Sequence, residues 1–143
     1  MRYAHSLEIT APIRQVFDLV AQPEKLPLWM TGLEEMVYTS QAQGRVGATF
    51  VHRMRRGRAE FRGKVTAYEK PHRFAFRVGN SAFSAEVEYL LEPLGDGTRL
   101  GYTLDVINRT RLTQLNEVLM GASTRRLARK QLKRLKKVAE RAA

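Results

Sequence analysis

"AFSAEVEYLLEPLGDGTRLGYTLDVI", residues 82–107, holds two runs of alternating apolar and polar residues around a Gly-Asp-Gly sequence. A period of two predicts β-strands, and the glycine-rich centre predicts a tight turn between them. The apolar residues of the first run are Phe83, Ala85, Val87, Tyr89 and Leu91, and those of the second are Leu100, Tyr102, Leu104 and Val106. The stretch therefore predicts an antiparallel hairpin with one apolar face.

Strand patterns continue upstream of this hairpin. They are "LEEMVYTS" (33–40), "VGATFVHRM" (46–54), "AEFRGKVTAYE" (59–69) and "RFAFRV" (73–78). Short turn sequences separate these runs, so the six strands are expected to be antiparallel neighbours. One more alternating run, "YAHSLEI" (3–9), lies near the N-terminus. It places Tyr3, His5, Leu7 and Ile9 on one face.

Helical spacing appears in two places. In "TAPIRQVFDLVAQ" (10–22), Ile13, Val16, Phe17 and Val20 recur at helical intervals, and Pro12 suits a first turn. "PEKLPLWM" (23–30) predicts a short second helix or turn. From about Thr110 to Ala143 the chain lacks proline and predicts a long helix of about 45 Å.

The long helical segment carries two apolar stripes that do not align. One consists of Met120, Leu127, Ala128, Gln131, Leu135 and Val138, and the other of Leu112, Leu115, Leu119 and Ala122. Gly121 falls where the stripe changes. We expect either a bend or break near Gly121, which the sequence favours, or a first half that is covered on two sides.

The order of elements predicts an α+β fold in one domain spanning residues 1–143. An antiparallel sheet with one apolar face needs a cover, and the long helix is the largest candidate. Seven strands are wider than one helix, so the sheet is expected to curl around it. Such an arrangement favours a space between helix and sheet.

Several phrases in this order resemble the helix-grip superfamily of START-like, polyketide cyclase/dehydratase-like and Bet v 1-type (SRPBCC) domains. They are "EITAPIRQVFDLVAQPEKLPLWMTGL" (8–33), "GRVGATF" (44–50), "KVTAYEKPHRFAFRV" (64–78), "YLLEPLGDGTRLGYTLDV" (89–106) and "LKRLKKVAE" (132–140). The resemblance implies a helix-grip fold: a seven-stranded curled antiparallel sheet, two short helices and a long C-terminal helix over a cavity. Members bind lipids, hormones, polyketides or quinones, and only some are enzymes.

The candidate ligand-binding residues are those that alternation and the resemblance direct into the cavity. They are Phe17, Trp29, Phe50, His52, Met54, Phe61, Phe76, Phe83, Val87, Tyr89, Tyr102 and Leu119. Apolar walls with few polar groups are typical of small-molecule sites and equally of a packed core. Trp29, the single tryptophan, has two interpretations: a lid at the cavity rim, or a plug that anchors the helix pair.

The sequence offers few groups for chemistry. Parity places His5 and His52 on apolar faces, and His72 lies in a predicted turn and is expected to be exposed. Zinc needs three or four ligands, and no carboxylate joins these histidines at a suitable spacing, so no metal site is predicted. No cofactor motif is present, and no catalytic residue is assigned. Tyr89, Tyr102 and His52 could polarise a carbonyl, which keeps a cyclase or dehydratase as the alternative.

Charge is concentrated near the C-terminus. The net charge is +11, and residues 125–141 hold nine lysines and arginines against one glutamate. A second basic cluster is Arg53, Arg55, Arg56, Arg58, Arg62 and Lys64. These charges are typical of a solvated surface. They would also favour weak contact with an anionic membrane, whereas the lack of interleaved aromatics argues against specific nucleic-acid binding.

These observations favour a carrier, sensor or accessory factor that binds a hydrophobic or amphipathic small molecule, rather than an enzyme. The chain has no cysteine, no apolar run long enough to cross a bilayer and no signal-peptide pattern, so a cytoplasmic protein is expected. A basic interaction module that contacts anionic membrane or nucleic acid is a further alternative. The sequence leaves a dimer open.

Overall fold

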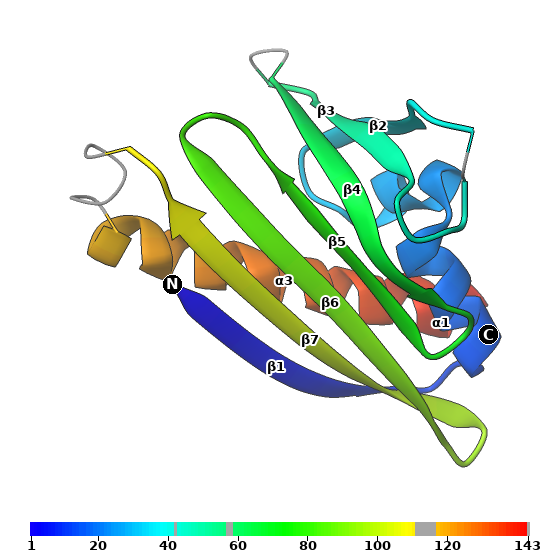
Figure 1. Ribbon diagram of the computed structural model, residues 1–143. Helices are drawn as coiled ribbons and strands as arrows, with labels where there is room; N and C mark the ends of the chain where they lie inside the picture. The colour runs from blue at the N-terminus through cyan, green and yellow to red at the C-terminus, as the bar shows by residue number, and fades with distance from the viewer. Residues whose placement is uncertain (42, 57–58, 111–116, 143) are drawn as a thin grey trace.

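The computed structural model describes residues 1–41, 43–56, 59–110 and 117–142, with the backbone alone for 117–120. A curled sheet lies in front of one long helix, and the short helices close one end (Figure 1). The elements in chain order are β1 (Arg2–Ile9), α1 (Ile13–Ala21), η1 (Pro23–Leu28), β2 (Leu33–Tyr38), β3 (Thr49–Met54), β4 (Glu60–Glu69), β5 (Arg73–Gly79), β6 (Phe83–Leu94), β7 (Gly97–Asn108) and α3 (Glu117–Ala142).

The seven strands form one antiparallel sheet in the order β1-β7-β6-β5-β4-β3-β2. The β6–β7 hairpin, predicted from residues 82–107, is its longest pairing, from Phe83 opposite Asn108 to Leu94 opposite Gly97. Gly95 at the turn has φ of 60°, a conformation that glycine adopts without strain. The predicted α+β helix-grip fold is therefore confirmed, and the structure adds that β1 pairs with β7.

The helix pair packs its apolar side against the sheet. In α1 the buried residues include Val16, Phe17 and Val20, as the helical spacing predicts. The short segment after it is a 3₁₀ helix, η1, which ends as Trp29 leaves the helical conformation. This pair closes one end of the sheet, next to the C-terminal end of α3.

The long helix α3 buries one stripe against the sheet. Its buried side chains include Ala128, Leu132, Leu135 and Ala139. The structure corrects two predictions for this segment. The helix does not break at Gly121, whereas a bend there stays a prediction, and Leu127, which the sequence placed in the apolar stripe, is 43% exposed. Leu127 precedes Ala128 by one residue, and that 100° rotation moves it off the buried face. The predicted segment 111–116 lies outside the described residues.

His5 is a further correction. Alternation placed it on the inner face of β1, yet its side chain is exposed and stacks on Tyr3 at a ring-centroid distance of 6.2 Å. Because β1 lies at the edge of the sheet, a side chain on its inner face stays exposed where no other element packs over it. Among the described helices, none combines the length and apolar character required to cross a bilayer.

Candidate functional site

The interior of the grip, which is the space between the curled sheet and the helices, has two ends that differ in packing. At the first, which we call the packed end, aromatic side chains and the helix pair nearly fill the space. A cavity of only about 10 Å³ remains, about the size of one water molecule. It is lined by Val20, Leu26, Met30, Met36, Phe50, His52, Phe74, Phe76 and Tyr89.

Close aromatic packing explains why this end is full. The ring of Phe50 lies 5.6 Å from that of Phe76 in an edge-to-face arrangement. It also lies directly over Gly63 of β4, where an added Cβ would come within 2.3 Å of the Phe50 ring. A side chain at position 63 would displace Phe50, so the glycine permits the close packing.

Two polar groups line this small cavity, His52 and Tyr89. Both are almost completely buried, and the side chain of neither forms a hydrogen bond with another described residue. Burial lowers the pKa of His52 to about 4, so the imidazole is neutral at neutral pH. Burial also raises the pKa of Tyr89 well above its usual value, so its hydroxyl keeps its proton and can donate. The pair combines a neutral base with a hydrogen-bond donor.

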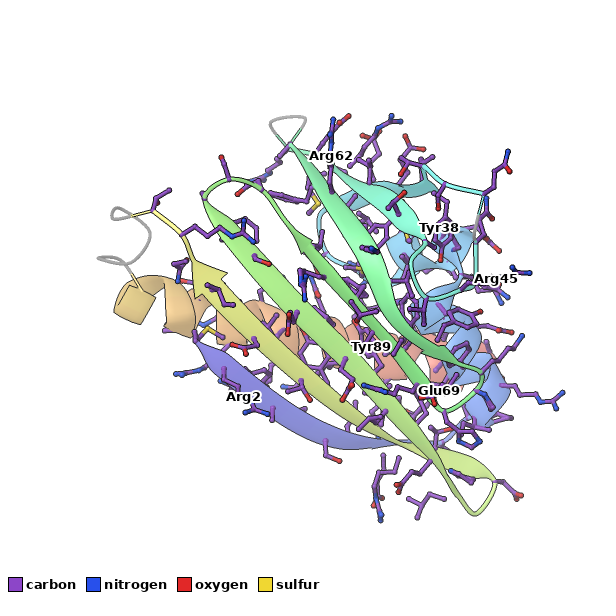
Figure 2. The ribbon with its side chains drawn as sticks, in the orientation of Figure 1. Arg2, Tyr38, Arg45, Arg62, Glu69 and Tyr89 are labelled. Carbon is purple, nitrogen blue, oxygen red and sulfur yellow. The ribbon has the colours of Figure 1, made fainter. Side chains whose placement is uncertain are left out.

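A row of tyrosines separates the two ends. Tyr89 pairs with Tyr102 across the β6–β7 ladder, with ring centroids 5.3 Å apart, and Tyr102 lies 6.3 Å from Tyr3. The label in Figure 2 places Tyr89 on β6, over the middle of the sheet. The Tyr3 hydroxyl oxygen is buried with no hydrogen-bond partner among the described residues. Burial is the main cause of the raised pKa of Tyr102.

Beyond the tyrosines lies the second end, which we call the hollow end. It encloses about 280 Å³ between β6, β7, the start of the described part of α3 and the first residue of the chain. Its lining is mainly apolar and consists of Met1, Phe83, Ala85, Leu104, Val106, Asn108, Gly121 and Thr124. Small-molecule sites have volumes of about 300–1,000 Å³, so this space is slightly smaller than the lower limit.

The predicted site residues divide between these places. Phe50, His52, Phe76 and Tyr89 line the packed end, and Phe83 lines the hollow end. Phe17, Val87 and Tyr102 are buried in the core, whereas Met54 and Phe61 are half-buried. Phe61 contacts Phe83 edge to face at 5.5 Å. The side chain of Leu119 lies outside the described residues.

Trp29 is 1% exposed, and its indole nitrogen donates a 2.7 Å hydrogen bond to the carbonyl oxygen of Leu19. This bond joins the end of η1 to the last turn of α1 and gives a helix-end carbonyl a partner. The indole also packs edge to face on Tyr89 at 6.2 Å. Trp29 thus anchors the helix pair, and a direct role in ligand binding stays a prediction.

Most of the hollow end was missed by sequence reasoning. Alternation does place Ala85 and Leu104 on the inner face, but it assigns no volume to the space in front of them. The available signal was residue size: Ala85 on β6 and Gly121 on α3 are both small and both line the space. Recognising it requires knowing that these two elements face each other.

Groups of three or more His, Cys, Asp or Glu side chains that could hold a metal ion are not found in the described part of the chain. His72, predicted in a turn, is exposed, with its Nδ1 3.3 Å from the Leu91 carbonyl oxygen. The polar groups inside the grip include the neutral imidazole and the tyrosine hydroxyls described above, and Asn108 and Thr124 at the hollow end. These groups can form hydrogen bonds with a ligand oxygen.

A curled sheet closed by a helix pair and gripped by one long helix, with an apolar interior, defines a helix-grip protein. The sequence matches the family model described as "Polyketide cyclase / dehydrase and lipid transport" over residues 2–140. The chain belongs to this family. No curated protein matches the sequence.

Solved structures agree with the fold. The protein TTHA0849 from Thermus thermophilus is 18% identical, with a TM-score of 0.78 over 100% of this chain and 99% of that one. BH1534 from Bacillus halodurans is also 18% identical, with a TM-score of 0.77 over 98% and 97%. DynU16, described as a putative protein in the dynemicin biosynthetic locus, is 19% identical, with a TM-score of 0.70 over 95% of this chain and 46% of that one.

Proposed function

We propose that the protein binds a hydrophobic or amphipathic small molecule inside the grip, as a carrier, sensor or accessory factor. The observation that carries the proposal is the hollow end, an apolar space of about 280 Å³ in a fold whose family includes lipid transport. The ligand's apolar part would occupy the space beside Phe83, Leu104 and Val106. Its polar part would face Asn108 and Thr124 at the same end.

The lining supports a ligand of mixed character. Apolar side chains dominate the wall, and burying apolar ligand surface against them is favourable by about 25 cal/mol per Å². A longer ligand that extended toward the packed end would reach the tyrosine row. Lipid, quinone, polyketide and other aromatic ligands all fit this description.

Filling the hollow end tests the proposal. Ala85 is buried and lines the space, so Ala85→Phe would occupy it. We expect 2-naphthol or laurate to bind the unchanged protein in isothermal titration calorimetry, and the variant to bind at least about tenfold more weakly. Thr66→Phe, on the exposed face of β4, is the matched control and should bind normally. A folded Ala85→Phe protein with unchanged affinity would exclude this end as the site.

An enzyme of the cyclase or dehydratase kind is the second candidate. The supporting observation is that neutral His52 and protonated Tyr89 line one cavity, are nearly fully buried and lack hydrogen-bond partners among the described residues. In this proposal Tyr89 donates a hydrogen bond to a substrate carbonyl while His52 accepts a proton from the adjacent carbon. The cavity must open for a substrate to reach them.

The two candidates can be separated by comparing binding with turnover. An aryl 1,5-diketone incubated with the protein should lose the mass of water, as detected by mass spectrometry, if the chain is a cyclase: the enolate carbon bonds to the distal carbonyl carbon, and the resulting hydroxyl leaves as water. Tyr89→Phe and His52→Phe should then abolish the loss while leaving binding at the hollow end intact. Binding without any mass change would favour the carrier.

The remaining predictions concern partners and location. Contact with an anionic membrane through α3, a dimer and a cytoplasmic location stay predictions. A single domain over residues 1–143 is likewise proposed from the sequence.

A further inference from the structure

The charges on the two outer surfaces of the molecule are paired to different extents. On the sheet, Arg53 lies 2.6 Å from Glu35, Arg73 lies 2.8 Å from Glu88, and Arg77 lies 2.9 Å from Glu86. On α3, the one acidic residue between Gly121 and Ala142 is Glu140. Its carboxylate accepts from the Thr10 N–H at 2.8 Å and lies 3.4 Å from Lys136. Among the described residues, the other cations of this stretch form no ion pair with an acidic side chain.

These cations form what we call the basic ridge. It consists of Arg126, Arg129, Lys130, Lys133, Lys137 and Arg141, all exposed, and none forms an ion pair with a described residue. Arg126, Lys130, Lys133 and Lys137 follow the i, i+4, i+7, i+11 spacing of one helix face. They extend over about 16 Å, on the side opposite the buried Leu135.

Apolar surface accompanies the charge. A space of about 480 Å³ lies between side chains on the outer surface of α3 and is bordered by Lys130, Lys133, Arg134, Lys136, Lys137 and Glu140. The methylene stems of lysine and arginine provide apolar walls there, while their charged ends reach water. Leu127 lies beside this surface, is 43% exposed, and precedes Lys130 by one turn. The combination of cations, aliphatic stems and an exposed leucine is typical of surfaces that lie at a lipid interface.

We propose that the basic ridge docks the protein on a lipid bilayer that carries anionic headgroups. Each cation near such a surface contributes attraction, and Leu127 would enter the headgroup region, where burial of its side chain is favourable. A nucleic acid would attract the same cations, but the described side chains of α3 include no aromatic on which bases could stack. A lipid surface would interact both with the cations of the basic ridge and with the apolar surface beside them.

The docking surface goes beyond the ligand proposal and does not depend on it. The same helix contributes Gly121 and Thr124 to the wall of the hollow end. Docking would therefore place α3, which borders the proposed ligand space, at the membrane surface. Vesicle binding can be measured in the absence of any ligand, so a failure of the docking proposal can be distinguished from a failure of the ligand proposal.

The test is sedimentation of the full chain with phosphatidylcholine vesicles, with and without phosphatidylglycerol. We expect binding to the anionic vesicles alone, and its loss at high salt. The ridge variant Arg126→Gln, Lys130→Gln, Lys133→Gln and Lys137→Gln should bind at least about tenfold more weakly. The matched control removes the same charge elsewhere, through Arg45→Gln, Arg62→Gln, Lys64→Gln and Arg99→Gln, which are exposed positions outside α3. It should keep most of the binding.

A second variant separates lipid from other anions. Leu127→Gln leaves the charge unchanged, so it should weaken vesicle binding by roughly threefold to tenfold and leave binding to heparin unchanged. Equal losses in the ridge and control variants would show that net charge alone is responsible and would overturn the proposal. Binding to duplex DNA without binding to anionic vesicles would assign the ridge to nucleic acid instead, with the same consequence.

Discussion

The packed and hollow ends share one sheet and one alternation pattern, yet they enclose about 10 and about 280 Å³. At the packed end, the helix pair and the strands bring large side chains together over Gly63. At the hollow end, two strands face the start of the described part of α3, where Ala85 and Gly121 are small. The space thus depends on how many elements cover the sheet and on the size of the residues where they meet. The larger of the two spaces lies where a single helix covers the sheet.

The largest expected contrast between the ends is the effect of truncating a phenylalanine. Phe50 is 1% exposed at the packed end, whereas Phe83 is half-buried beside the hollow. Phe50→Ala should reduce the free energy of unfolding by about 3–5 kcal/mol, because it removes buried contacts and leaves a cavity. Phe83→Ala should cost less than about 2 kcal/mol, because its ring already borders empty space and solvent. Urea unfolding with an unchanged m value measures both.

Equal losses in these two variants would contradict the distinction between the ends. The comparison holds the residue type constant, so differences in side-chain hydrophobicity do not contribute. A change in m would instead indicate that the unfolded or native state had altered.

A second contrast is the dependence of stability on pH. The pKa of His52 is about 4 in the folded protein and about 6.5 in an unfolded chain, so between these values the unfolded state binds the proton more readily. The stabilisation that neutral His52 contributes to the folded protein is therefore present above about pH 6.5 and is lost as the pH falls toward 4. We expect a loss of roughly 3 kcal/mol from this residue.

Urea unfolding at several pH values measures this loss as the difference between the unchanged protein and His52→Phe, since carboxylates titrate in both. His5→Phe is the matched control, because His5 is exposed on β1, and it should keep the pH dependence of the unchanged protein. If His52→Phe also kept that dependence, His52 would not be the buried neutral group.

The fold could be predicted from the sequence because its signals are local. Alternation in residues 82–107, the turn at Gly95 and the helical spacing around Phe17 each depend on a few neighbouring residues. The site could not be predicted in the same way. Phe50 meets Gly63, and Ala85 and Gly121 come to border one space, only after distant segments are brought together. His5 was misplaced because parity gives a direction without showing whether another element covers it. Leu127 was misplaced because it points about 100° away from the buried Ala128.

The smallest expected effect comes from enlarging an alanine at each end. Ala85 at the hollow end is 8% exposed and borders free space, while Ala21 on α1 is 4% exposed within the packed core. Ala21→Leu should destabilise the protein by about 1–3 kcal/mol, because the surrounding side chains must move. Ala85→Leu should change the stability by less than about 1 kcal/mol, or raise it, because the added methyl groups enter a space lined by Leu104 and Val106. Thermal and urea unfolding of the two variants give the comparison, and a loss at Ala85 as large as that at Ala21 would mean that the hollow closes in solution. In that case the apolar ligand would have to open its own site, and its affinity would be reduced by the cost of that opening.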